Sequence, residues 1–549
     1  LDGLEEQDLQ GLEGLIENPV DLNRTGREEL WFVNDSLNQR IITARTNGAF
    51  AGWPDLASRA KLSQAELEAL QQFTFISSQS EMVGQISNRV IMRNGEDHLR
   101  LRVAAKDHLG SLLINLDSDP NNTFVPINFA TSFEVRSIVL LLGSHRYTWG
   151  TGLLLANEFN PPRGEALLSF RSPHNRLRAA ASRRRDNLIN GLSLRYGGDR
   201  ASYTVGRDLS DGDSLAYLSG SIQLSQLTAG FLITTHSKPA DITLIDGKGR
   251  GYAGYLQYSI NSAAGQWMIS HENATRQARQ AHITWLKYVS APSLINGTLK
   301  LALSIRHFPD RWRALRGRLP NSRSSSGNEH GEYMGWRWST AGLKFAGYLD
   351  RSRPLTPPTV QTRTVTGEEV GLSVERKGRR FTGGLNWRQS RGGWTTEAPG
   401  SAAPVEQLFL DTRSNYWRFH GDYVWSAAQS VGVLLAYSRS ADPPEGGEAL
   451  GLRWRYKPSW TDLKVTLGGY RFRVNAWSNR VYVWEDGLPG EFNFRSLSGT
   501  GYRIYGRIIK PLQGGALALR IARQWRSSSS NDDSRTSDTE IGLQIDIAL

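Results

Sequence analysis

The chain has 549 residues and a net charge of +12, and it contains no cysteine, so neither a disulfide framework nor a thiolate metal site can form. Glycine (55 residues) and aromatic side chains (17 Trp, 18 Tyr, 18 Phe) are abundant, and no stretch approaches the roughly 20 apolar residues of a membrane-spanning helix. Short alternating segments rich in Trp and Tyr are typical of a bacterial outer-membrane barrel. No signal peptide opens the chain, so we expect any targeting segment to have been removed or never to have been present.

The first 77 residues differ in charge and periodicity from the rest of the chain. They carry 13 acidic and 6 basic side chains, a net charge of −7, which leaves +19 on the remainder. Apolar residues recur at helical spacing, and Thr25-x-x-Glu28 has the form of a capping box. Ser36 is placed to cap a helix that ends before Gly48. We predict a small all-α domain of three or four short helices over residues 1–77.

After about residue 80 the apolar spacing changes from about 3.6 to 2. Leu299–Ile305, Leu452–Tyr456, Leu517–Ile521 and Ile541–Leu549 alternate apolar side chains with charged, polar or small ones. A soluble β-sandwich would need a second layer against the apolar face, whereas a barrel in lipid explains both this face and the opposite charged one. Closure also removes the unpaired edges that lipid cannot satisfy.

We therefore predict a mainly β protein: a large antiparallel transmembrane β-barrel over residues 78–549, of about 16–18 strands or more and an even number. The long polar segments Arg311–Gly331 and Arg526–Thr539 predict extracellular loops, and short segments such as Gln513–Gly515 predict periplasmic turns. The apolar side switches at Gly468-Gly469, which predicts a bulge or a strand boundary. The helical domain is then expected in the periplasm or inside the barrel lumen of a bacterial outer-membrane protein.

Residues 19–73 resemble the helix-hairpin-helix domain of the periplasmic competence DNA receptor. The shared pattern is Asp21-Leu22-Asn23, Glu28-Glu29-Leu30, Ile41-Ile42-x-x-Arg45-x-x-Gly48-x-Phe50 and Asp55-Leu56. The rest resembles large outer-membrane proteins of Bacteroidota-type bacteria that begin with this domain, through the segments Leu141–Leu153 and Arg171–Arg176. The resemblance implies an architecture rather than an activity.

The two hairpins of this domain depart from the DNA-binding pattern, in which glycine-rich hairpins bring backbone amides close to phosphates. Here both lack glycine; their residues include Asn34, Asp35 and Ser36 in the first and Arg59, Ala60 and Lys61 in the second. The charge of −7 also opposes duplex binding, which needs phosphate neutralisation by Lys and Arg. We expect a plug or protein-docking role, and a DNA-uptake pore with a DNA-binding domain stays as the alternative.

Few residues suggest catalysis or metal binding. The adjacent acid–histidine pairs are Asp97-His98, Asp107-His108, His271-Glu272 and Glu329-His330, and neighbours in a strand point to opposite faces. The ten histidines show no metal-like spacing, and Gly249-x-Gly251-x-x-Gly254 enters a strand, where we interpret it as a turn and not as a phosphate site. We expect no enzymatic activity, no metal and no cofactor, with an outer-membrane hydrolase as a weaker alternative.

Two arginine clusters are the remaining signal. They comprise Arg176, Arg178, Arg183, Arg184 and Arg185, and Arg306, Arg311, Arg313, Arg316 and Arg318. In a lumen they would favour anions, at the outer rim they would bind lipopolysaccharide phosphates by bidentate contacts, and a solvated loop face is the alternative to both. Exposed aromatic residues are expected to form interfacial girdles, as at Trp336, Trp338, Trp417 and Trp425.

These observations favour a non-enzymatic barrel that acts as a channel or as a scaffold in an envelope complex, with the helical domain as plug or docking module. The expected partners are outer-membrane lipid, lipopolysaccharide and other envelope proteins. The sequence indicates this architecture more sharply than the transported species.

Overall fold

The structure is a computed structural model. It describes residues 20–23, 35–45, 48–62, 66–67, 70, 74–76, 83–93, 96–106, 110–118, 124–135, 137–155, 168, 176–179, 188–197, 201–209, 214–237, 249–291, 297–310, 312, 315, 327–355, 366–396, 408–440, 446–476, 479–489, 493–527 and 535–548.

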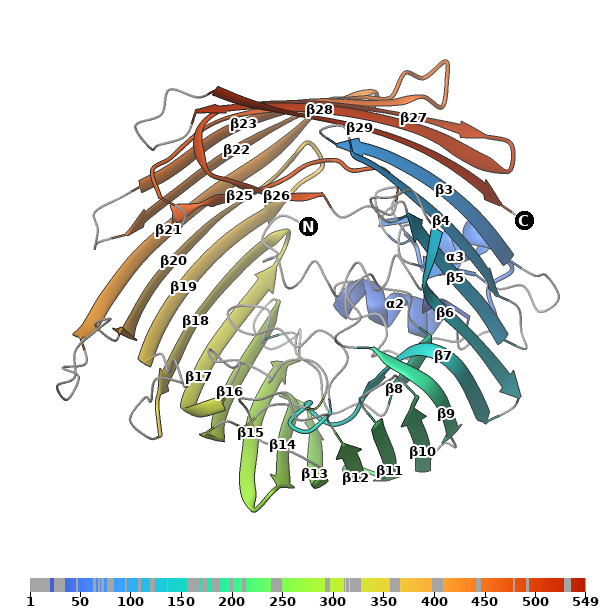
Figure 1. The fold of residues 1–549 in the computed structure, drawn as a ribbon, viewed down its shortest axis with the longest axis vertical. Helices are drawn as coiled ribbons and strands as arrows, with labels where there is room; N and C mark the ends of the chain where they lie inside the picture. Colours follow the sequence, from blue (N-terminus) through green and yellow to red (C-terminus); the bar gives the residue numbers. More distant parts are fainter. Residues whose placement is uncertain are drawn as a thin grey trace.

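Most described residues belong to a closed antiparallel barrel, which forms the outline in Figure 1. Its strands are β3 (Val83–Arg93), β4 (Glu96–Lys106), β5 (Gly110–Ser118), β6 (Phe124–Val135), β7 (Ile138–Thr148), β8 (Arg176–Ala179), β9 (Ile189–Gly197), β10 (Ala201–Asp208), β11 (Ser214–Leu224), β12 (Leu227–Ser237), β13 (Gly249–Ser262), β14 (Gly265–Arg276), β15 (Arg279–Ser290), β16 (Thr298–Asp310), β17 (Gly327–Thr340), β18 (Leu343–Arg353), β19 (Thr366–Lys377), β20 (Phe381–Thr396), β21 (Leu408–Ser426), β22 (Gln429–Ser440), β23 (Gly446–Tyr456), β24 (Lys464–Val474), β27 (Gly499–Leu512), β28 (Gly515–Ser527) and β29 (Arg535–Ala548).

The barrel closes between its last and first strands. β29 pairs with β3 from Glu540↔Arg93 to Ala548↔Gln85, so neither strand keeps a free edge there. β8 is a short strand that pairs with the end of β7, while the rest of β7 pairs directly with β9. Among the described residues, 24 long strands therefore surround the lumen. This number is even, as predicted, and is larger than the 16–18 strands that the prediction gave as its lower bound.

The two faces of the wall follow the alternation read from the sequence. In β16, Leu301, Leu303 and Ile305 point outward and are 37%, 43% and 53% exposed, whereas Ser304 and Arg306 face the lumen and are buried. The apolar residues of β23, β28 and β29 face outward in the same way. The predicted aromatic residues, Trp336, Trp338, Trp417 and Trp425, are also exposed on this outer face. The alternation is confirmed.

Connections of different length lie at the two ends of the barrel. One end has tight turns, such as residues 263–264, 341–342 and 513–514, and we call it the short-turn end. The other, the long-loop end, has the longer connections, such as residues 238–248 and 475–498. The predicted loops Arg311–Gly331 and Arg526–Thr539 are longer than the connections in the structure. β17 already begins at Gly327, β28 ends at Ser527, and β29 begins at Arg535.

The described part of residues 1–77 is not all-α. It contains α2 (Asp35–Arg45), α3 (Trp53–Arg59) and a parallel pair of two-residue strands, β1 (Val20–Asp21) and β2 (Thr74–Phe75), which joins the two ends of the segment. The helices share a buried core that includes Leu22, Leu37, Ile41, Phe50, Leu56 and Leu70. The all-α prediction is wrong because the extended ends complete this core by backbone pairing.

The termini of α2 follow the sequence signals with one shift. Gly48 adopts a φ of +111°, and its N–H donates to the Arg45 carbonyl at 3.0 Å, as expected of a glycine that ends a helix. The helix already begins at Asp35, so Ser36 lies within its first turn and not at the predicted cap. No helix among the described residues is both long and apolar enough to cross a lipid bilayer. The boundary between residues 77 and 78 stays a prediction.

The outward face yields a direct test at two adjacent positions of β13. Leu256 is outward and 52% exposed, and its neighbour Gln257 faces the lumen. Leu256→Arg is expected to destabilise the barrel in a lipid bilayer by about 2–4 kcal/mol, because the guanidinium would enter hydrocarbon, whereas Gln257→Arg should be close to neutral. Urea titrations of the protein refolded into vesicles measure both; equal losses would show that lipid does not cover this face.

Candidate functional site

The connection between β24 and β27 folds into the barrel. Its residues form a hairpin of β25 (Val481–Trp484) and β26 (Phe494–Leu497), paired from Val481↔Leu497 to Trp484↔Phe494. In Figure 1 this hairpin lies inside the outline of the barrel. The side chains of Val481, Val483 and Leu497 are fully buried. We call this element, described over residues 479–489 and 493–498, the lumenal hairpin.

The lumenal hairpin packs on an apolar patch of the inner wall. Its three buried side chains meet Tyr470, Phe472, Val474, Tyr505, Ala436, Ala449 and Ala522. Small residues allow the close approach, since a Cβ at Gly447 of β23 would collide with the Asn479 carbonyl.

This patch explains the change of apolar side at Gly468-Gly469. β24 pairs without interruption with β23 and β27 through both glycines, so the predicted bulge or strand boundary is wrong. Leu467 points outward, whereas Tyr470 and Phe472 point inward to receive the hairpin. The strand stays regular, and what changes is the layer against which its apolar residues pack.

A carboxylate at the tip of β25 anchors the hairpin to the wall. Glu485 is fully buried and accepts hydrogen bonds from Arg503 of β27, through Nε and through Nη2 at 2.9 Å, and from Arg520 Nη2 of β28 at 2.5 Å. Arg520 also donates to Glu540 of β29 at 2.5 Å, and Glu540 accepts from Arg495 on β26. Removing one partner of such a buried network leaves the others as uncompensated charges.

The next residue extends the contact to a second group of arginines. Asp486 lies 3.1 Å from Arg455 Nη2 and 3.6 Å from Arg507 Nη2. Burial raises the pKa of this carboxyl, but the guanidinium groups of Arg455, Arg507 and Arg453 outweigh burial and hold the pKa below its ordinary value. Asp486 is therefore ionised at neutral pH.

Hydrogen bonds to backbone carbonyls complete the attachment. The Tyr470 hydroxyl donates to the Trp484 carbonyl at 2.5 Å, Arg507 Nη1 donates to the Gly487 carbonyl at 2.8 Å, and Gln544 Nε2 donates to the Pro489 carbonyl at 2.9 Å. The hairpin is thus tied to β24, β27 and β29, and its backbone carbonyls find donors on the wall.

The charges of this site do not balance. The wall contributes Arg453, Arg455, Arg503, Arg507, Arg520, Asp422 and Glu540, and the hairpin contributes Glu485, Asp486 and Arg495. Without the hairpin, five guanidinium groups of this network would keep Asp422 and Glu540 as paired carboxylates, with Asp538 of β29 acting on Arg503 from the same wall.

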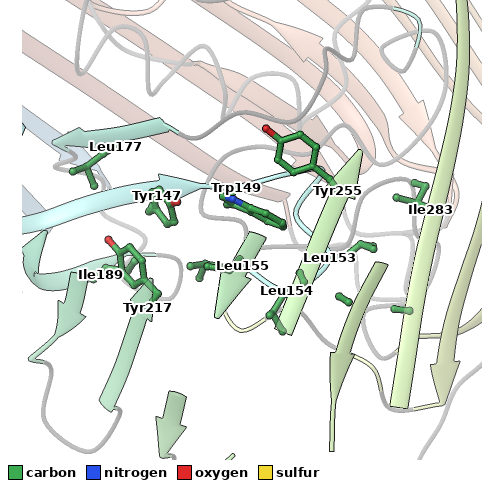
Figure 2. Close-up of a cluster of buried hydrophobic side chains, with 14 of the residues drawn as sticks. Tyr147, Trp149, Leu153, Leu154, Leu155, Leu177, Ile189, Tyr217, Tyr255 and Ile283 are labelled. Atoms are coloured by element: carbon green, nitrogen blue, oxygen red, sulfur yellow. The ribbon is translucent and has the colours of Figure 1, made fainter. Parts of the chain in front are cut away.

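A second segment, residues 149–155, also turns inward, directly after β7. Figure 2 shows Trp149 and Leu153–Leu155 packed with Tyr147, Tyr217, Tyr255 and Ile283. The Trp312 indole N–H donates to the Leu153 carbonyl at 3.0 Å. The Gly-x-Gly-Leu stretch that suggested the barrel resemblance is therefore a buried contact with the lumenal face.

One buried carboxylate holds this second segment. Glu272 of β14 accepts the backbone N–H of Thr151 and, at 3.2 Å, that of Leu153. Gly150 has a φ of +60°, and a Cβ there would collide with the same carboxylate. Gly251 of β13 leaves room for Leu154, so the Gly249-x-Gly251-x-x-Gly254 letters lie within a strand and mark a close approach, not the expected turn.

The structure describes only part of the predicted arginine sites. Arg176 and Arg178 lie in β8, whereas Arg183, Arg184, Arg185, Arg311, Arg313, Arg316 and Arg318 fall outside the described residues. Arg306 is buried in the wall between Glu329 at 2.7 Å and Asp350 at 2.9 Å. It serves an internal ion triad, and an anion-binding role for the other arginines stays a prediction.

The second predicted hairpin of the N-terminal segment is a helix end. Arg59 closes α3 and donates to the carbonyls of Ala44, Gly48 and Ala49 and, at 3.1 Å, to Asp55. Ala60 is buried, and Lys61 is exposed. Asp35 and Ser36 lie in α2, and Asn34 is outside the described residues. Arg59 thus stabilises the fold of the segment.

Two of the four adjacent acid–histidine pairs separate across the wall as expected. Glu272 and Glu329 face the lumen, and His271 and His330 face outward. Asp97 and His98 lie in β4, and Asp107 and His108 fall outside the described residues. The structure instead brings Ser193 within 2.6 Å of His145 Nε2, but both side chains are fully buried beside Tyr217, so this pair packs the wall.

The sequence did not single out Glu485, Asp486, Arg503 or Arg520. Two signals were present: the change of apolar side at Gly468-Gly469, and the alternate arginines Arg453 and Arg455 of β23. Neither assigns a partner, because the hairpin meets strands distant in the sequence.

No protein-family model matches the chain, and no curated protein matches it in sequence. Among solved structures it is similar to the copper transporter OprC (8% identity, TM-score 0.45, covering 87% of this chain and 84% of that one). It is also similar to the iron transporter FrpB from Neisseria meningitidis (10%, 0.44, 86% and 82%) and to the translocation pore of the P pilus usher PapC (11%, 0.39, 85% and 99%). At these values the likeness carries no functional argument, and the barrel is described from the strand pairing of this chain.

Glu485→Ala is expected to release the lumenal hairpin. The substitution leaves Arg503 and Arg520 without their shared carboxylate, and breaking a buried pair of this type costs about 3–5 kcal/mol. Hydrogen exchange of the amides of residues 481–497 should accelerate. Glu448→Ala, which removes an exposed outward glutamate of β23, is the control. Unchanged exchange in the first variant would show that the ion pairs do not hold the hairpin.

Acid is expected to loosen the same contact. Because the folded-state pKa of Asp486 is below its ordinary value of 3.8, its contribution is complete above about pH 4 and is lost as the pH falls through the lower folded value. Protection of the hairpin amides against exchange should therefore fall below about pH 4. In Asp486→Asn the hairpin amides should be less protected at pH 7, and their protection should fall less between pH 7 and acid pH. If protection falls with acid as it does in the parent, another group causes the transition.

Proposed function

We propose that this protein is a non-enzymatic outer-membrane channel for anionic solutes, with a lumen narrowed by the lumenal hairpin. The observation that carries the proposal is the hairpin itself, which occupies the lumen and places Glu485 and Asp486 among the arginines of the wall. A hairpin that neutralises a basic lumen is suited to gate it.

The membrane placement rests on three features of the described wall. Its strands close without a free edge, its outer face is apolar, and its longest connections all lie at one end. These are the requirements of a barrel in a bacterial outer membrane, with the short-turn end and the C-terminus in the periplasm and the long-loop end outside.

Selectivity for anions follows from the inner wall. Arg453 and Arg455 of β23 and Arg503 and Arg507 of β27, the two strands that flank β24, gather around the hairpin carboxylates Asp486 and Glu485. Guanidinium groups stay charged at every physiological pH and bind carboxylate or phosphate in bidentate geometry. A solute with such a group would compete with the hairpin carboxylates.

The N-terminal segment is proposed as a helix-hairpin-helix domain that plugs or docks beneath the barrel. Two observations support this role: α2 lies within the ring of strands in Figure 1, and the segment carries −7 against +19 on the remainder. Envelope proteins and lipopolysaccharide are the proposed partners, and a scaffold role in an envelope complex is compatible with the same surfaces. Salt-dependent DNA retention by residues 1–77 would favour a DNA-uptake pore instead.

The channel proposal is tested by replacing residues 480–497 with a short Gly-Ser turn. Conductance in planar bilayers should rise, because an obstruction leaves the lumen, and reversal potentials under a salt gradient should move towards anion selectivity, because five wall arginines lose the hairpin carboxylates. Glu448→Ala is the matched control, and deletion of residues 1–77 separates a plug from the hairpin. A closed or cation-selective variant would contradict the proposal.

A further inference from the structure

Four histidines distant in the sequence lie side by side on four neighbouring strands. They are His271 of β14, His282 of β15, His307 of β16 and His330 of β17. The last three are direct cross-strand partners, His282↔His307 and His307↔His330. The rings of His282 and His307 stack with centroids 4.9 Å apart and planes 7° apart, and those of His307 and His330 are 6.4 Å apart.

These imidazoles belong to the outer face of the wall. Their neighbours in sequence, Ile283, Arg306 and Glu329, are buried on the lumenal face. Ile305, two residues before His307, is outward and 53% exposed. The row lies where the apolar belt gives way to the long-loop end, because His307 is close to the end of β16 at Asp310 and His330 to the start of β17 at Gly327.

The row continues with a cation on the next strand. Arg353 of β18 is the cross-strand partner of His330. Arg351 is the cross-strand partner of Glu332, and its side chain forms an ion pair with Glu368 at 3.0 Å. Glu332 lies 3.9 Å from His330. Other outward arginines stand at this end of the barrel, among them Arg207 and Arg439. The row His282, His307, His330 and Arg353 thus combines three imidazoles with one guanidinium group, and Glu332 lies beside His330.

The side chains of the row and its position on the wall indicate which kind of ligand would bind there. Phosphate oxygens accept hydrogen bonds from imidazolium and from the planar guanidinium fork, and these charge-assisted bonds are the strong ones. Three adjacent imidazoles repel one another once protonated, and an anion held between them removes that repulsion. At the boundary where an apolar belt ends, the anions at hand are the phosphate groups of the lipid.

We propose that His282, His307, His330 and Arg353 form an external binding site for the phosphate groups of outer-leaflet lipid A. The proposal rests on the membrane placement proposed above, and it concerns the outer wall and not the lumen. It makes attachment to lipid depend on pH, because only a protonated imidazole carries the charge that a phosphate group attracts. The other groups that face the row are Asn273, Thr284, His271, Glu332 and Arg351.

The test uses the full chain in detergent with bisphosphorylated lipid A as the probe, and native mass spectrometry counts the lipid retained at pH 6 and pH 8. The variant His282→Gln/His307→Gln/His330→Gln keeps polar side chains but cannot acquire charge. We expect it to bind lipid A about tenfold more weakly at pH 6, equivalent to the loss of one charge-assisted hydrogen bond, and to lose the difference between pH 6 and pH 8. Arg353→Gln should weaken binding at both pH values.

The matched control is Arg376→Gln/Lys510→Gln, which removes two outward cations near the short-turn end and should leave retention unchanged. Lipid A without its phosphates should bind every variant equally. Equal retention by parent and triple variant at pH 6 would overturn the site, as would abolition of retention by EDTA, which would indicate a bound metal ion. If the protein forms channels in bilayers but shows one of these two results, only the lipid A site is contradicted. If the protein does not insert into lipid, the proposed membrane placement is contradicted as well.

Discussion

A sheet surrounded by lipid has no water to satisfy an unpaired edge, so the pairing of β29 with β3 is the contact on which the rest of the molecule depends. Once the wall is closed, backbone groups are paired around the ring, and each strand has one face for lipid and one for the lumen. Leu303 and Ser304 illustrate the division, since adjacent residues lie on opposite faces and only the second is buried.

The closed wall encloses more space than its own side chains fill, and inward-folded segments use this space. The lumenal hairpin and residues 149–155 share one design: apolar side chains pack on the wall, and a buried carboxylate receives several donors. The two differ in what the carboxylate meets. Glu272 accepts hydrogen bonds from backbone amides, and these bonds break only when the segment moves. Glu485 accepts hydrogen bonds from guanidinium groups, which an anionic solute can also bind.

The same arginine chemistry has different consequences on the two faces of the wall. Inside, guanidinium groups are paired with Glu485, Asp486 and Asp422, the contacts on which the proposed anion selectivity rests. Outside, Arg353 continues a row of imidazoles where the apolar belt ends. A channel with both features would couple its selectivity to lumenal ion pairs and its attachment in the membrane to the state of its histidines.

The sequence by itself determined the alternation, the closed-barrel architecture, the short turns and the contrast in charge between the first 77 residues and the rest, because period, turn residues and charge are local properties. Only the tertiary structure decided the meaning of Gly468-Gly469, the partners of Glu485 and the row of histidines. Each depends on residues that are separated along the chain but adjacent in the barrel: the hairpin meets β23, β27 and β28, and His307 meets His282 and His330. Spacing along a chain does not reveal neighbours across a sheet, since register is fixed by closure and by the layer that each face packs against.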